Sequence, residues 1–137
     1  MKKKSTDKIN AAVIGLGFGL VHAEVYKKNK DCNLIYLCDF NRKHEKICEK
    51  KFNCNFSINA NSIISNKNID MISIASYDNY HYSQILTALK NKKHVFVEKP
   101  LCQTRRELDH IKKELKKNKS IKFSSNFVLR AHPKFVK

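Results

Sequence analysis

The chain has 137 residues, enough for one domain with a core of its own, and its 42% apolar content is ordinary for a folded protein. The basic segment 1–8 is not followed by the apolar region of a signal peptide. The apolar runs are far shorter than the roughly 18 residues of a membrane-spanning helix, so the sequence excludes a protein that crosses a membrane as a helix. We therefore expect a cytoplasmic protein.

The formal net charge of +16 raises the question of a polyanionic partner. Arginine, which suits bidentate contacts with bases and phosphates, occurs only at Arg42, Arg105, Arg106 and Arg130. The many lysines are spread over the chain, and solvated lysines from an AT-rich coding sequence explain the charge without such a partner. We expect no specific nucleic-acid binding; a basic nucleic-acid-binding domain is kept as the less favoured alternative.

The five cysteines are scattered through the chain, without a Cys-x-x-Cys pair and without a histidine at zinc-ligand spacing. This pattern favours reduced thiols that serve as small core residues, and it predicts no metal site.

Short apolar runs alternate with longer amphipathic stretches, which is typical of repeated β-α-β units. Strands are predicted at 9–14, 34–38, 54–56, 71–75, 94–97 and 121–127. Helices are predicted at 20–28, 42–51 and 59–65, along the stripe of Tyr82, Ile85, Leu86 and Leu89, and from Thr104, whose partner Glu107 completes a capping box. The predicted fold is α/β: a doubly wound (Rossmann), mostly parallel six-stranded sheet with helices on both faces.

A glycine turn follows the first predicted strand, with Gly15, Gly17 and Gly19 as the only glycines of the chain. Glycines at a strand-to-helix turn let the backbone approach a pyrophosphate, which the helix N-terminus then attracts. The usual G-x-G-x-x-G spacing would put the third glycine at position 20, where the chain has leucine. The turn predicts a phosphate site, while the helix-packing role of its third glycine stays open.

Asp39 ends the second predicted strand, close to the expected offset of a carboxylate that binds the adenosine ribose. Such a carboxylate would repel a 2′-phosphate and favours NAD, although Arg42 keeps NADP possible. The alternative is that Asp39 only caps the helix that begins near Arg42.

Two further polar segments follow predicted strands, where a parallel sheet binds its ligands. The segment 75–81 offers Ser76, Tyr77 and His81; its tyrosines can stack on a ring or simply pack, and its histidine alone would more often lie on a helix surface. Glu98, Lys99 and Pro100 end the fifth strand. There Lys99 can move a proton or hold a substrate hydroxyl, but a surface ion pair explains the motif equally well.

Taken together, these segments resemble the N-terminal domain of the Gfo/Idh/MocA oxidoreductases. The matching stretches are the glycine turn with His22 and Ala23, Cys38-Asp39, residues 72–81, residues 94–101 around Glu98-Lys99-Pro100, and residues 126–133. Within 72–81, Ser76, Tyr77 and Asp78 stand in place of the family's Thr, Pro and Asn. The resemblance covers the chain from about residue 9 to its end.

The resemblance implies a nicotinamide-dependent enzyme that transfers a hydride to or from a carbinol carbon of a sugar, cyclitol or sugar nucleotide. Lys99 would be catalytic, Glu98 would help to hold the nicotinamide side, and Lys99 and Arg130 would face the substrate. The implied cofactor-binding residues are Gly15, Gly17, Phe18, Gly19, Asp39, Arg42, Ser76, Tyr77, His81, Glu98 and Lys99.

The resemblance also implies a domain order. Residues 1–8 would be a basic tail, 9–127 the Rossmann domain and 128–137 the start of a connection to a second, substrate-binding domain, which the 137 residues lack. We therefore expect these residues alone to be inactive, and the full-length form to be able to form a homo-oligomer. A non-catalytic NAD(P)-binding module is the main alternative.

Overall fold

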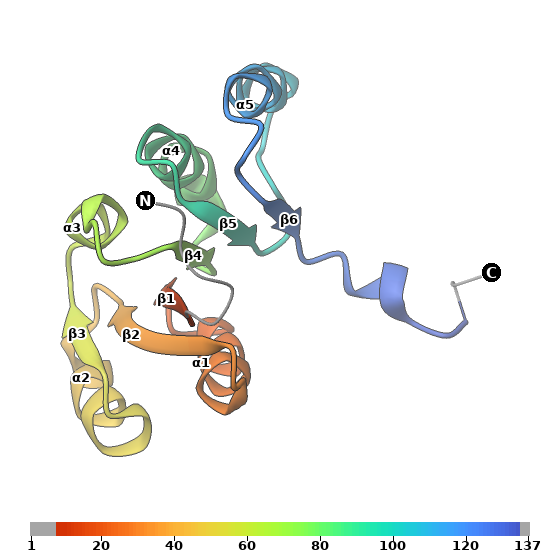
Figure 1. Ribbon diagram of the computed structural model, residues 1–137. Coiled ribbons are helices and arrows are strands. Elements are labelled where there is room, and N and C mark those ends of the chain that lie inside the picture. Colours follow the sequence, from red (N-terminus) through yellow and green to blue (C-terminus); the bar gives the residue numbers. More distant parts are fainter. Residues whose placement is uncertain (1–7, 135–137) are drawn as a thin grey trace.

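The computed structural model describes residues 8–134 and contains a single six-stranded sheet (Figure 1). Its strands are β1 (Ile9–Ile14), β2 (Cys32–Cys38), β3 (Asn55–Ser57), β4 (Met71–Ile74), β5 (His94–Val97) and β6 (Phe123–Ser125). The expected basic tail 1–8, apart from Lys8, and the last three residues of the expected connection 128–137 lie outside the described residues.

The strand order is β3-β2-β1-β4-β5-β6, and every neighbouring pair is parallel. This confirms the doubly wound fold and sharpens "mostly parallel" to wholly parallel. The order reverses direction between β1 and β4, and such a switch point leaves a crevice at the carboxyl ends of the strands.

The helices cover both faces of the sheet (Figure 1). Helix α1 (Gly19–Lys28) and the helical segment formed by η1 (Arg42–His44), α2 (Glu45–Ile47) and η2 (Cys48–Phe52) pack on one face. Helices α3 (Ala60–Ser65), α4 (Asp78–Lys90) and α5 (Arg105–Lys117) pack on the other. Each face therefore has its own apolar core, centred on Phe52 and Leu37 on the first and on Ile72, Ile85 and Leu89 on the second.

Local sequence explains where α5 begins. Thr104 accepts a hydrogen bond from the backbone N–H of Glu107, and the Glu107 carboxylate accepts one from the N–H of Thr104. This is the predicted capping box, and it satisfies backbone donors that the first turn of a helix leaves free. The helical segment 42–52, in contrast, changes from a 3-10 turn to a single α turn and then a π turn, so it is less regular than the predicted helix.

The sixth strand is shorter than the predicted 121–127. The N–H of Ile121 still belongs to a turn, with the carbonyl of Asn118 as its acceptor 3.0 Å away. The N–H of Phe127 turns back to the carbonyl of Ser125 at 2.9 Å, which ends the extended backbone. Beyond this point the chain leaves the sheet and forms the short turn η3 (Val128–Ala131) away from the body of the domain (Figure 1).

Among residues 8–134, no helix is both long enough and apolar enough to cross a membrane.

Candidate functional site

The strand ends of the sheet are aligned in one row. Ile14 is paired with Cys38 and with Ile74, Cys38 with Ser57, Ile74 with Val97, and Val97 with Ser125. The six residues that directly follow this row line one cavity of about 970 Å³: Gly15, Asp39, Ile58, Ala75, Glu98 and Asn126. The register of the sheet therefore gathers segments that are far apart in the sequence at one ligand crevice.

The three glycines of the turn have three different roles. Gly15 has φ +86°, and a Cβ there would lie 2.4 Å from backbone atoms of Ala75 and Ser76. A Cβ at Gly17 would meet no atom of the described residues within 4 Å. A Cβ at Gly19 would lie 2.8 Å from Val13, so this glycine lets α1 pack closely on β1 despite its unusual spacing. The packing role that the spacing left open thus belongs to Gly19.

The N-terminus of α1 is open toward the turn. No side chain in the described part of the chain caps it, and its first turn carries no acidic residue. The free backbone N–H groups and positive dipole end of a helix attract an anion. Together with the open space in front of Gly17, this makes the turn fit a pyrophosphate.

Asp39 is buried, with only 8% of its surface exposed. Its Oδ2 accepts a hydrogen bond from the N–H of Leu16 at 2.8 Å, and its Oδ1 accepts one from the N–H of Asn41 at 2.8 Å. The carboxylate therefore fixes the glycine turn to the end of β2. The helical segment is capped by Asn41, whose side chain accepts from Lys43, so the alternative of Asp39 as the cap of that segment is wrong.

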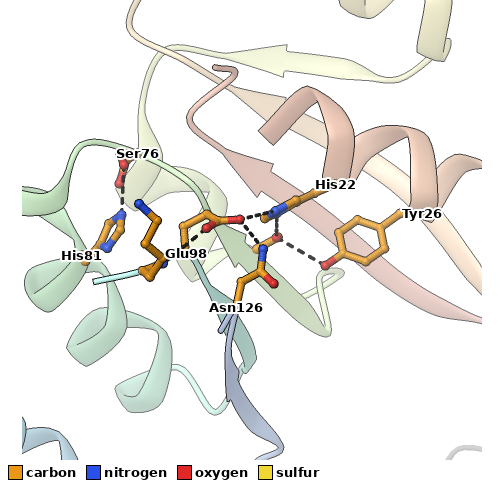
Figure 2. Close-up of polar contacts among 8 residues, drawn as sticks. His22, Tyr26, Ser76, His81, Glu98 and Asn126 are labelled. Carbon is orange, nitrogen blue, oxygen red and sulfur yellow. Dashed lines mark hydrogen bonds and ion pairs between the residues drawn. The ribbon is translucent and has the colours of Figure 1, made fainter. Parts of the chain in front are cut away.

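Glu98 is the centre of a hydrogen-bond network at the end of β5 (Figure 2). Its Oε1 accepts from Nε2 of His22 at 2.9 Å and from Nδ2 of Asn126 at 2.6 Å. The other ring nitrogen of His22 lies 2.8 Å from the hydroxyl of Ser73, which accepts from the hydroxyl of Tyr26 at 3.3 Å. The network joins α1, β4, β5 and the end of β6 at one carboxylate.

The network keeps Glu98 ionised. Burial raises the pKa of this carboxyl, but hydrogen bonds from Asn126 and His22, the charge of His22 and the N–H of Lys99 together outweigh burial. The net result is a pKa below the ordinary 4.5. The surface ion pair that the sequence left open for Glu98 and Lys99 is not formed: the Glu98 carboxylate is only 12% exposed and pairs with His22.

Lys99 also lines the cavity. Within the described part of the chain its ammonium has no hydrogen-bond or ion-pair partner, and only its backbone N–H is engaged, with Oε2 of Glu98 at 3.3 Å. A cation that is not held by the protein is free to contact a bound ligand.

The loop after β4 is held by His81, which is fully buried rather than on the helix surface. Its Nδ1 lies 2.7 Å from the carbonyl of Pro100. Its Nε2 lies 2.9 Å from the carbonyl of Ser76 (Figure 2). The hydroxyl of Ser76 donates to Gln84 on α4 at 2.7 Å. These residues shape the cavity wall, and His81 joins the β4 loop to the loop that carries Lys99.

Exposed aromatic rings stand at the β2 side of the cavity. Phe40 and Tyr77 are 71% and 66% exposed, both line the cavity, and their ring centroids are 6.0 Å apart. Phe18 also lines it and is exposed. Large apolar side chains left in water beside a crevice are typical of a ligand surface.

Three of the predicted site residues, Gly19, Arg42 and Arg130, do not line the cavity. The guanidinium of Arg42 is exposed and lies 3.9 Å from the carboxylate of Glu45. The guanidinium of Arg130 lies 4.7 Å from the centre of the Phe127 ring. Neither lines the cavity.

Sequence reasoning missed several residues of the site, namely Phe40, Tyr26, Ser73, Gln84 and Asn126. The position of Asn126, directly after the sixth strand, is the same signal that pointed to Asp39 and Glu98. His22 was noted only as part of the family pattern. No signal in the sequence marks Ser73, which is buried in the middle of a strand.

Within residues 8–134, no group of three or more His, Cys, Asp or Glu side chains is placed to hold a metal ion. All five cysteines are free thiols. Burial raises the pKa of Cys38 and of Cys48 to about 12, so these thiols stay protonated and inert in the core.

The sheet order, the glycine turn at the switch point and the carboxylate after β2 define a dinucleotide-binding Rossmann domain. The model of the oxidoreductase family with an NAD-binding Rossmann fold, GFO_IDH_MocA, matches residues 9–127. The chain therefore belongs to the Gfo/Idh/MocA family, as its sequence motifs predicted.

Two curated relatives place the chain within this family. Myo-inositol 2-dehydrogenase of Thermotoga maritima is 32% identical over 114 residues, which are 82% of this chain and 34% of that protein. D-glucoside 3-dehydrogenase of Escherichia coli is 29% identical over 116 residues, 75% of this chain and 33% of that protein. The chain thus spans about a third of the length of these relatives.

Solved structures show the same fold. Myo-inositol 2-dehydrogenase of Lactobacillus plantarum superimposes with a TM-score of 0.86 at 27% identity, over 93% of this chain and 38% of that one. Scyllo-inositol dehydrogenase of Lactobacillus casei, solved with NAD(H) and scyllo-inositol, superimposes with a TM-score of 0.86 at 24% identity and with the same coverage. The second likeness supports the fold only.

Proposed function

We propose that this chain binds NAD in the cavity at the strand ends and is the cofactor-binding part of an oxidoreductase. The observation that carries the proposal is the open space in front of Gly17, which lines the cavity at the uncapped N-terminus of α1. A pyrophosphate there would receive backbone N–H groups without a side chain in between.

The remaining parts of the dinucleotide would extend to both sides of the turn. On the β2 side, the adenine would lie against Phe40 and Tyr77, and the adenosine ribose would contact Asp39. The buried carboxylate disfavours a 2′-phosphate, and Arg42 points to Glu45 instead of the cavity. Both features support NAD over NADP.

On the β5 side, the nicotinamide would lie near Glu98 and Lys99. When bound, the nicotinamide ring supplies the hydride donor or acceptor of the reaction. The unpartnered ammonium of Lys99 is suited to hold a substrate hydroxyl and to assist the loss of its proton.

The substrate class follows the relatives, which are named as dehydrogenases of an inositol and of a glucoside. We propose a polyol or sugar with a carbinol carbon as substrate. Because the relatives are about three times as long as the matched segment, we propose that turnover requires a substrate-binding part in addition to residues 8–134.

Calorimetric titration with NAD and NADP, followed by a turnover assay on inositols and sugars, tests this proposal. We expect binding of NAD that is tighter than that of NADP. Turnover by the 137 residues alone would contradict the need for a further part. Binding without turnover even in a chain joined to a relative's substrate-binding part would favour the non-catalytic module.

A further inference from the structure

The two oxygens of the Glu98 carboxylate have different surroundings. Oε1 accepts two hydrogen bonds, from His22 at 2.9 Å and from Asn126 at 2.6 Å. Among residues 8–134, the partner of Oε2 is the N–H of Lys99 alone, at the long distance of 3.3 Å. Since a carboxylate oxygen offers two lone pairs, Oε2 keeps acceptor capacity in the wall of the cavity.

The directions of the hydrogen bonds in the network make Glu98 an acceptor. The hydroxyl of Tyr26 donates to Ser73, so the Ser73 hydroxyl is free to donate to Nδ1 of His22. A neutral His22 then carries its proton on Nε2 and donates it to Glu98. A charged His22 donates to Glu98 as well. In both states Glu98 is held as a hydrogen-bond acceptor, and beside a neutral His22 it is a fixed negative group.

The glycine turn in the lining of the same cavity has a different chemistry. The turn and the N-terminus of α1 attract anions, whereas the wall at Glu98 carries a carboxylate. Lys99 lies beside Glu98, but its side chain is exposed, so water screens its charge more than that of the 12% exposed carboxylate.

We propose that Glu98 selects the terminal ring of the bound dinucleotide: it accepts a hydrogen bond from an uncharged carboxamide and disfavours a ring that carries a carboxylate. This inference rests on the proposed function, because it concerns the nicotinamide end of the same site. It makes Glu98 a specificity-determining residue, with His22 and Asn126 as the residues that position it.

The test compares three ligands that share the ADP-ribose part: NAD, nicotinic acid adenine dinucleotide and ADP-ribose itself. Titrations of the wild-type chain should give NAD an affinity at least about tenfold above that of the acid analogue, as expected for a like charge set against a fixed carboxylate. Glu98→Gln should reduce this ratio severalfold and leave the affinity for ADP-ribose within about twofold, since the amide carries no charge to repel the acid.

Lys99→Met is the matched variant at the neighbouring position. Removal of the cation should increase the preference for NAD over the acid analogue, the opposite of the change in Glu98→Gln. An equal affinity of the wild-type chain for NAD and the acid analogue, or an unchanged ratio in Glu98→Gln, would overturn the inference. If the wild-type chain binds none of the three ligands, the proposed function itself fails, which separates the two outcomes. Retained affinity for ADP-ribose shows that each variant is folded.

Discussion

Nε2 of His22 lies 2.9 Å from Oε1 of Glu98, although the two residues are 76 positions apart in the chain. His22 belongs to the first turn of α1 and Glu98 directly follows β5, so one contact ties the glycine turn to the far half of the sheet. The pair is almost fully buried, with 8% and 12% of its side chains exposed. Breaking a buried pair by removing one partner is costly, because the other is left without compensation.

Acid should weaken the fold through Glu98. The folded-state pKa of this carboxyl is lowered below its ordinary 4.5, so its stabilisation is present above that value and is lost as the pH falls through the lowered pKa. Glu98→Gln should cost about 1–3 kcal/mol at neutral pH, the usual value of hydrogen bonds to a charged group. Urea unfolding at several pH values measures the free energy of unfolding of the wild-type chain and of Glu98→Gln. The difference between the two should shrink below about pH 4.5. A difference in unfolding free energy that does not change with pH would contradict the lowered pKa of Glu98.

Alanine at two glycines of the turn should have opposite effects. Gly15→Ala forces a Cβ to within 2.4 Å of the Ala75 carbonyl at a φ of +86°, which should destabilise the fold by about 2–5 kcal/mol. Gly17→Ala adds a methyl group to open space and serves as the matched control, with a change in stability of less than about 1 kcal/mol. Thermal unfolding measures the change in stability of each variant. Equal losses of stability in Gly15→Ala and Gly17→Ala would contradict the geometry of the turn.

Asp39 should act on both the fold and the choice of cofactor. Asp39→Ala leaves the buried N–H of Leu16 without its acceptor, at a cost of about 1–3 kcal/mol. The same change removes a negative charge from the ribose side, so NAD should bind more weakly and the ratio of NADP to NAD affinity should rise. Calorimetry with both cofactors measures this ratio, and Asp39→Asn, which keeps an acceptor, separates charge from anchoring. An unchanged ratio in both variants would rule out contact with the ribose.

Phe40 should contribute to the adenine end of the site. Its ring is 71% exposed and faces Tyr77, so Phe40→Ala should leave the core intact and weaken binding of AMP about three- to tenfold, a typical stacking loss. Val25→Ala, at an exposed position of α1 that does not line the cavity, is the control and should leave AMP binding unchanged. Equal affinities of the two variants for AMP would contradict a contact between adenine and Phe40.

Much of the fold could be predicted because local signals were strong. The first strand, Ile9–Ile14, is a short apolar run that ends at a glycine, and it was predicted to the residue. The start of α5 followed from the Thr104–Glu107 capping box. The sixth strand was predicted too long, because the apolar residues Ile121 and Phe127 continue its pattern while the backbone already turns at both ends.

The position of the site could be predicted, but its interior could not. Strand ends of a parallel sheet meet at one edge, which located Gly15, Asp39 and Glu98. The partners of these residues depend on which side chains face each other across helices and strands. Neither the buried contact of Ser73 with His22 nor the inward turn of Asp39 toward Leu16 leaves a local pattern in the sequence.

Calorimetric titration of the wild-type chain and of Gly17→Asp with NAD tests most directly whether the glycine turn binds the pyrophosphate of NAD. The open space at Gly17 lets the variant fold, while its carboxylate would occupy the pyrophosphate position with a like charge. We predict saturable one-to-one binding of NAD by the wild-type chain and a loss of affinity of about 100-fold or more in the variant. Equal NAD affinity of the two folded chains, or no binding by the wild-type chain, would contradict the account.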